Sequence, residues 1–444
     1  LIMKSFIDTI KNIWRIEELR KRILITLGLL LVYRIGSFIV LPGVNSAALG
    51  SASSGGSGLV DLLSIFTGGA FTRASIFALG VMPYISASII MQLAGIAIPA
   101  VQKMQREESG RRRMNQWTRY ITIVIALFQA PGYILTYVDA NARPVNDALW
   151  MPVSVIILTC STLFVMWIGE RITERGLGNG TSLIIMIGIL ARLPESFLQE
   201  FVSRMGTGGG GLVVILVEVV IWLLIIAGNI LLVQGTRRIP VQFAKRVQGN
   251  KQYGGVRNYV PLKVNAAGVM PIIFAQAIVL VPLYLSSAFE NPPQWMTNFS
   301  RYESFAYNIT LFLLVVAFTY FYTAITVNPN QLADDMKRNG GFIPGVKPGK
   351  ATASHIDDLL SRITLPGAIF LGIVAILPAF AIMAGIKQGY AQFFGGTSLL
   401  IMVGVLLDTL QQIESHLLMR HYDGLMKTGR IKGRQSAAYS MATG

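Results

Sequence analysis

Apolar segments recur along this chain of 444 residues and restrict it to a membrane architecture. Ten such segments lie at about 23–44, 74–101, 120–138, 149–169, 181–193, 212–233, 264–289, 305–327, 363–385 and 397–410. Hydrophobic residues make up 53% of the chain and charged residues only 14%, which is typical of a protein that crosses the membrane many times. Because a spanning backbone must satisfy its own hydrogen bonds, we expect an all-α integral membrane fold of ten transmembrane helices.

The basic residues alternate between the two sides of these ten segments. The second, fourth, sixth and eighth connections, together with both ends of the chain, hold 31 of the 38 Lys and Arg residues. By the positive-inside rule, this side is cytoplasmic and carries both termini. Residues 1–22 are predicted to form a basic amphipathic helix on the membrane surface, and residues 414–444 to form a cytoplasmic tail.

An internal repeat divides the chain into two parts. GTSLIIMIGIL from Gly180 recurs as GTSLLIMVGVL from Gly396, with eight of eleven positions identical, and GVMPYI from Gly80 recurs more weakly as GVMPII from Gly268. Both pairs fit five helices in residues 23–205 followed by five in 206–413. Since five is odd, the two halves cross the membrane in opposite directions, and the sequence predicts inverted pseudo-symmetric halves around a central path. The fifth and tenth segments are expected to be short, ending at Pro194 and at Asp408.

The repeat pairs four isoleucines. Ile85 corresponds to Ile273, and Ile185 to Ile401. Four such residues at symmetry-related positions could form an apolar ring, which excludes ions because it loses water and offers no replacement for their hydration. Ordinary helix packing is the alternative interpretation for each of them.

Residues 55–92 combine a Gly/Ser-rich leader, a short apolar helix at 59–66, a break at Gly68-Gly69 and a long helix from Ala74. Eight helical residues rise only about 12 Å, too little to span a bilayer. Such a segment is expected to fold back into a protein-lined cavity. A helix resting on the membrane surface is the alternative.

Two long basic connections, 235–263 and 328–362, are rich in Gly and Pro and are predicted to be functional cytoplasmic loops. Their charge is compatible with determination of topology and lipid contact, with a nucleic-acid surface, or with a docking site for a protein motor. Three histidines outside the apolar segments and a single cysteine do not supply a protease or metal site at membrane depth. A solute transporter is the main rival, with Arg34, Glu218 and Asp408 as its candidate ionisable residues.

At this point the motifs identify a family. The chain resembles the SecY family of protein-conducting channels over nearly its whole length. The matching stretches are SGGSGLVDLLSIFTGGAFTRASIFALGVMPYISASIIMQL, SGRRRMNQWTRY, ITERGLGNGTSLIIMIGI, RRIPVQFAKR, PLKVNAAGVMPIIFA, NPNQLADDMKRNGGFIPGVKPG and FGGTSLLI.

The resemblance implies a channel subunit that translocates unfolded preproteins and releases transmembrane segments laterally, without catalytic residue or cofactor. It implies a plug at about 59–68, a pore ring and a lateral gate that opens between the second and third helices on one side and the seventh and eighth on the other. The implied pore ring is Val81, Ile85, Ile185, Ile273 and Ile401; the plug residues are Leu59, Leu62, Leu63, Ile65, Phe66, Gly68 and Gly69; the gate residues are Ser86, Gln92 and Asn265.

The same resemblance implies partners and a location. The partners are the SecE and SecG subunits, the SecA ATPase, the ribosome, membrane lipids, and signal sequences and nascent chains as substrates, at the cell inner membrane. SecA and ribosome docking is implied for Arg237, Arg238, Lys245, Arg246 and Lys347. Lys347 stands where family members commonly have arginine, and lysine lacks the planar fork of a guanidinium, so the motor contact is expected to differ there.

Overall fold

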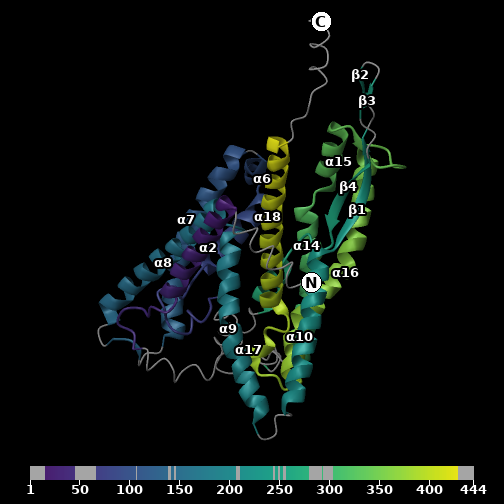
Figure 1. Ribbon diagram of the computed structural model, residues 1–444. Helices are drawn as coiled ribbons and strands as arrows, with labels where there is room; N and C mark the ends of the chain where they lie inside the picture. Colours follow the sequence, from purple (N-terminus) through teal and green to yellow (C-terminus); the bar gives the residue numbers. More distant parts are fainter. Residues whose placement is uncertain are drawn as a thin grey trace.

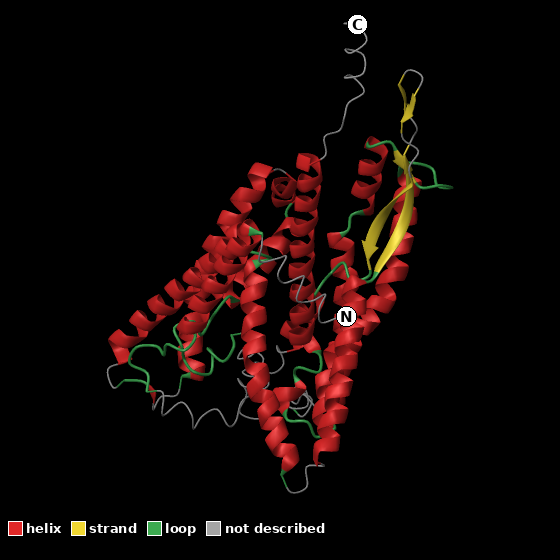
Figure 2. Cartoon of the chain, in the orientation of Figure 1, coloured by secondary structure: helices red, strands yellow, loops and turns green. Residues whose placement is uncertain are grey.

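The computed structural model describes residues 16–45, 67–106, 108–138, 142–144, 147–206, 211–243, 246–248, 251–253, 257–279, 293 and 304–428. Helices dominate this part of the chain, and a small group of strands lies at one end of the molecule (Figures 1 and 2). We call that end the hairpin side.

Two bundles of helices make up the body of the protein. The first bundle contains α2 (Glu17–Gly36), α5 (Met82–Ala97), α6 (Pro99–Arg106), α7 (Glu108–Tyr137), α8 (Asp147–Arg175) and α9 (Gly180–Met205). The second bundle contains α10 (Gly211–Gln234), α11 (Met270–Val279), α14 (Phe305–Thr326), α15 (Pro329–Arg338), α16 (Lys350–Met383), α17 (Gln388–Ala391) and α18 (Gly396–Thr428). In the first bundle α7 packs against α5, α6 and α8, and in the second α14 packs against α11 and α16.

The apolar character of the helices matches the sequence prediction. Seven of the described helices are long and apolar enough to cross a membrane, and they fall within α7, α8, α9, α10, α14, α16 and α18. The other three predicted segments contain α2, α5 and α11. Large apolar side chains such as Leu31 on α2 and Val213 on α10 are 62% and 73% exposed, as expected for helices surrounded by lipid.

Several helix boundaries differ from the apolar segments predicted from sequence; α7 and α16, for example, begin at Glu108 and Lys350, before the segments that start at about 120 and 363. The second helix begins at Met82 and not at Ala74, because residues 67–80 form turns whose backbone pairs with the end of the first helix region. There the Leu41 amide donates to the Ala74 carbonyl at 2.8 Å and the Ile76 amide to the Ile39 carbonyl at 2.9 Å. Positive φ at Ala74 (46°) and Gly80 (51°) is incompatible with a continuous helix here.

The expected short fifth and tenth helices are also corrected. α9 has 26 residues and continues through Pro194 to Met205, and α18 has 33 residues and continues through Asp408. Apolar runs end at these residues, but the helices do not, because charged side chains beyond them find partners or solvent. Proline is tolerated within transmembrane helices because neighbouring groups can satisfy the freed carbonyl.

The predicted basic loops are largely structured. Strand β1 (Thr236–Phe243) pairs antiparallel with β4 (Arg257–Lys263), with Thr236 opposite Lys263, and pairs at its other edge with β5 (Gly341–Phe342). β2 (Arg246–Gln248) and β3 (Lys251–Tyr253) extend this hairpin away from the bundles (Figure 1). The alternation in RRIPVQF buries Ile239 and Val241 against α16, where Ile356 is fully buried.

The repeated GTS sequences begin α9 and α18. Asn179 caps α9, because its side-chain oxygen accepts from the Thr181 and Ser182 amides at 3.1 and 3.4 Å. Gly180 lies so close to the Gly169 carbonyl on α8 that a side chain there would overlap it. The small residues of the motif therefore permit the close contact between α8 and α9.

We predict that Asn179→Ala lowers the free energy of unfolding by about 1 kcal/mol, since two amides at the start of α9 lose their acceptor. Asn179→Asp keeps an acceptor and should have little effect. Thermal unfolding in detergent measures both variants, and equal stability of the alanine variant and the unmodified protein would contradict the capping role.

Candidate functional site: an apolar constriction between two bundles

Four of the five predicted pore-ring residues lie in one buried apolar cluster. Val81, Ile185 and Ile401 are 4%, 8% and 7% exposed, and the half-buried Ile85 packs against the same cluster. Val81 is the residue that precedes α5, and Ile85 lies one turn later on that helix, whereas Ile185 comes from α9 and Ile401 from α18. The cluster thus draws apolar side chains from both bundles and could act as a constriction.

Ile273, the fifth predicted ring residue, is half-buried on α11 and is not a member of the clusters formed by the described residues. Its amide donates to the carbonyl of Val269, one turn earlier, at 3.4 Å. Val269 itself packs against the constriction cluster. The structure therefore brings α11 to the cluster through Val269.

Gly68 and Gly69, which end the predicted plug, form a turn held by two arginines. The Gly68 carbonyl accepts from Arg73 Nη2 at 2.8 Å and from Arg34 Nη1 at 3.4 Å, and the Gly69 carbonyl accepts from Arg73 Nε at 3.1 Å. Arg73 also lies over the ring of Phe38, 4.3 Å from its centre. The other predicted plug residues, Leu59, Leu62, Leu63, Ile65 and Phe66, lie outside the described residues.

The turn also requires glycine where it meets α9. Gly68 has φ +62°, and an added Cβ would lie 3.0 Å from Cα of Gly188. At Gly404, which occupies the same place in the second repeat, an added Cβ would meet no atom of the described residues within 4 Å. Within the described part of the chain, the close contact is therefore confined to the first repeat.

The predicted gate residues lie on α5 and just before α11. Ser86 is half-buried and Gln92 exposed, both on α5. Asn265 is half-buried in the turn between β4 and α11, and its buried Oδ1 has no hydrogen-bond donor among the described residues. No extensive packing joins α5 or α6 to α11 or α14 in the described part of the chain.

A groove of about 1090 Å³ lies on this side of the molecule. Gln102 of α6 lines it from the first bundle, and Lys263 of β4, Thr326 of α14 and Asp335 of α15 line it from the second. The groove therefore separates the two bundles on the hairpin side.

The predicted docking residues are on the hairpin and in the turn before α16. Arg237 and Arg238 are exposed on β1, and Lys347 is exposed before Gly349, the residue preceding α16. Arg246 begins β2, and Lys245 lies outside the described residues. Thr352 donates to the Lys347 carbonyl at 2.9 Å and so fixes the backbone of that turn.

The three candidate ionisable residues of a transporter either bond to other residues or are exposed on the surface of the protein. Arg34 donates to Gly68, Glu218 pairs with Arg204 at 2.7 Å, and Asp408 is exposed on α18. Among the described residues no group of His, Cys, Asp and Glu is arranged to hold a metal ion.

Sequence reasoning missed Glu200 and Arg204. They lie four residues apart on α9 and pair at 2.8 Å; Glu200 is buried, and the Arg204 side chain is 15% exposed. That i, i+4 spacing of opposite charges beyond Pro194 was the available signal.

The fold and the constriction define a class: an all-helical, multi-pass membrane protein of two bundles with an apolar waist. The family model described as SecY matches residues 75–410. The chain is 40% identical over 438 residues to the protein translocase subunit SecY of Thermotoga maritima, covering 96% of this chain and 99% of that one. The SecY subunit of Mycobacterium bovis is 40% identical over 451 residues, covering 96% and 100%.

Solved structures support the same fold. "The structure of a protein conducting channel" superposes with a TM-score of 0.59 at 15% identity, covering 89% of this chain and 92% of that one. Sec61 in the canine ribosome-channel complex from the endoplasmic reticulum gives a TM-score of 0.56 at 14% identity with the same coverage. The chain belongs to the SecY family. It is therefore a channel-type subunit of a translocase and not an enzyme.

We predict that Gly68→Ala raises ion leak through the protein in planar bilayers, because the methyl group would displace the turn from Gly188 and from Arg34. Gly268→Ala is the matched control, since Gly268 has φ +65° but open space around it. The difference between the variants isolates the contact from backbone strain. Equal conductance of the two would contradict a sealing role for the Gly68 turn.

Proposed function

We propose that the chain conducts unfolded polypeptides through the constriction and releases apolar segments sideways into lipid. The observation that carries this proposal is the gathering of Val81, Ile85, Ile185 and Ile401, from both bundles, in one buried cluster. An apolar waist contains no group that replaces the hydration of an ion, so it resists ions while flexible side chains let a peptide chain pass.

The lateral path in this proposal runs between α5 and α7 on one side and α11 and α14 on the other. Two observations support this path: the described helices on its two sides pack sparsely against each other, and a groove lined by Gln102 and Lys263 lies between them. An apolar segment of a substrate that reaches this path gains free energy by entering lipid, at about 0.3 to 0.6 kcal/mol for each Leu or Ile. Ser86, Gln92 and Asn265 are the proposed polar gate residues.

The proposed location is the cell inner membrane, with both termini and the hairpin in the cytoplasm. The alternation of basic connections supports this orientation. SecE and SecG are proposed as companion subunits. SecA and the ribosome are proposed to dock on the hairpin and the Lys347 turn. Two of the similar solved structures are ribosome complexes by their titles, the canine Sec61 complex and the yeast Ssh1 complex.

We expect Ile85→Gly to increase ion conductance in planar bilayers, because it removes a branched side chain from the constriction. Ile90→Gly is the control, because Ile90 lies on the same helix but is 47% exposed. This substitution has the same cost in helix propensity but removes no side chain from the constriction. If the two variants conduct equally, the constriction is not the seal.

Lys347→Glu should reduce translocation driven by an added motor ATPase, because the exposed turn would then repel an acidic docking partner. Lys347→Arg keeps the charge and adds a bidentate fork, so it should equal or exceed the unmodified protein. Translocation of a purified preprotein into proteoliposomes measures both. Normal insertion of the glutamate variant into the membrane would show that the loss of translocation comes from docking and not from misfolding. Unchanged translocation by this variant would contradict the docking site.

A further inference from the structure

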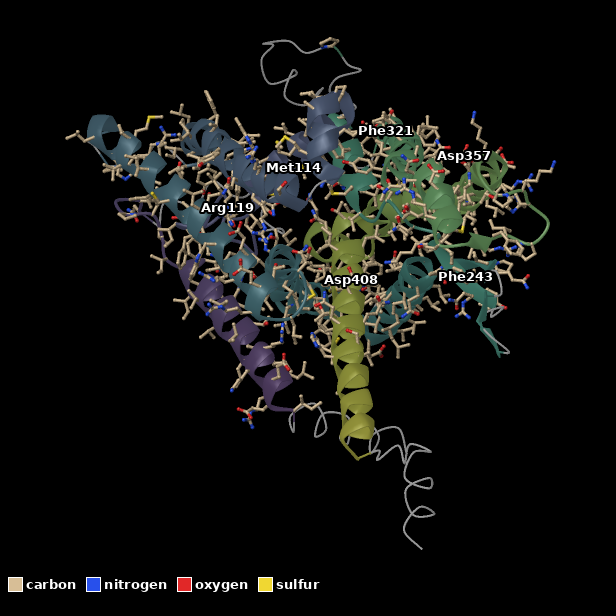
Figure 3. All side chains as sticks on the ribbon, turned by 90° about the horizontal axis from the view of Figure 1, so that it is seen from above. Met114, Arg119, Phe243, Phe321, Asp357 and Asp408 are labelled. Atoms are coloured by element: carbon tan, nitrogen blue, oxygen red, sulfur yellow. The ribbon has the colours of Figure 1, made fainter. Side chains whose placement is uncertain are left out.

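Two glutamates of this chain are buried, although the proposed channel function does not use them. Glu200 on α9 and Glu218 on α10 are 2% and 6% exposed. By contrast, Asp357 on α16 and Asp408 on α18, both labelled in Figure 3, are exposed. Burial of a carboxylate in apolar surroundings is costly unless its charge is balanced. The groups around the two glutamates therefore decide which charge each of them can carry.

One guanidinium lies between the two carboxyl groups. Arg204 Nε lies 2.8 Å from Glu200 Oε1 on the same helix, and Arg204 Nη2 lies 2.7 Å from Glu218 Oε1. The Arg204 side chain is itself only 15% exposed. We call these three residues the ion cluster. If both glutamates were ionised, the cluster would contain one negative charge in excess.

The two glutamates differ in their hydrogen bonds. The Lys387 amide, just before α17, donates to Glu200 Oε2 at 2.8 Å. Glu218 is buried and has an ion-pair contact with Arg204 at Oε1, but neither of its oxygens accepts a hydrogen bond from the described residues. Hydrogen bonds to a carboxylate favour its charged form. Glu200 is therefore the better-stabilised carboxylate, and Glu218 is the better place for a proton.

Tyr390 of α17 also faces the two glutamates. Its side chain is buried, and this burial, together with the charges of Glu218 and Glu200, raises the pKa of Tyr390 to about 12. The phenol is therefore neutral at neutral pH, and its buried hydroxyl has no hydrogen-bond partner among the described residues. α18, which also packs against α10, meets that helix through apolar side chains such as Leu399 and Val403. The described surroundings supply no positive charge beyond that of Arg204.

We propose that Glu218 is a proton-binding site and that the ion cluster holds one proton there at neutral pH. With Glu218 neutral, one carboxylate, that of Glu200, stands against one guanidinium, and the buried charges balance. Release of the proton would leave an uncompensated negative charge among α9, α10 and α17, which is strongly unfavourable. The ligand of this site is the proton, and no step of the proposed channel function is needed to bind it.

The position of the cluster indicates the side from which the proton comes. The cluster lies at the end of α9 that is remote from the hairpin side, next to α17 (Figure 1). In the orientation proposed above, with the hairpin in the cytoplasm, this end faces the outer side of the membrane. That assignment rests on the proposed function, whereas the proton site itself rests on the buried cluster alone.

Infrared difference spectroscopy of the full-length protein in nanodiscs tests the site, because a protonated carboxyl group has a carbonyl stretching band that a carboxylate lacks. An exposed glutamate, with an ordinary pKa of about 4.3, is ionised at neutral pH and gives no such band. We expect a band from a buried protonated carboxyl group at neutral pH, and Glu218→Gln should remove it. Glu195→Gln is the matched control, since Glu195 is exposed on α9, and it should leave the band unchanged.

Thermal unfolding at several pH values gives a second measurement. The folded protein should bind one more proton than the unfolded chain at neutral pH, so its stability falls as the pH rises. Glu218→Gln is neutral at every pH and should remove this contribution, so that the two proteins differ in pH dependence by one proton. The glutamine variant should therefore be the more stable protein, relative to the unmodified one, at alkaline pH than at acidic pH.

Two outcomes would overturn the proton site. One is the absence of a protonated carboxyl band that Glu218→Gln removes, and the other is the same pH dependence of unfolding in both proteins. Neither measurement uses a substrate or a motor. Failed translocation with the expected band would contradict the channel proposal and leave the proton site intact, and loss of the proton site would leave the channel proposal intact.

Discussion

The interior of a lipid bilayer offers no hydrogen-bond partners, so polar groups buried there must be satisfied by the protein itself. Three arginines that lie just outside the predicted apolar segments show the same requirement at sites where protein packing excludes water. Arg73 bonds the Gly68 and Gly69 carbonyls, and Arg143 donates to the Ile134 and Val138 carbonyls near the end of α7. Arg204 pairs with two buried carboxylates, those of Glu200 and Glu218. In each case a charged side chain fastens segments that apolar packing alone would allow to slide.

Hydropathy and charge alternation predicted the class of fold well, because the bilayer fixes the length and polarity of a spanning segment. They located ten segments, and the bounds of α10 and α14 agree with two of these segments to within one residue. The same rule failed for α9, since apolar residues stop at Pro194 while the helix continues with Glu200 and Arg204 paired in its interior. A window of hydropathy measures composition and does not detect a charge that has a partner.

The hairpin escaped prediction for a different reason. RRIPVQF alternates in the manner of a strand, but Pro240 and the surrounding Gly-rich sequence favour a loop. The pairing that makes it a strand comes from β4, about twenty residues later, and from β5, a hundred residues later. Long-range pairing of this kind depends on the α16 surface that buries Ile239 and Val241, which no local pattern reveals.

The repeat predicted the equivalence of the isoleucines from sequence symmetry, but the structure treats the two halves differently. Gly188 meets the Gly68 turn, whereas an added Cβ at Gly404 would meet no atom of the described residues within 4 Å. Ile85 and Ile185 lie in or against the constriction cluster, whereas Ile273 lies on α11, the helix that borders the sparsely packed side. The asymmetry has a physical basis: α9 is bonded at both ends to the second bundle, and α11 has no comparable described bond to the first. In the proposed channel, the waist would therefore yield on the α11 side first, since less packing must be broken there.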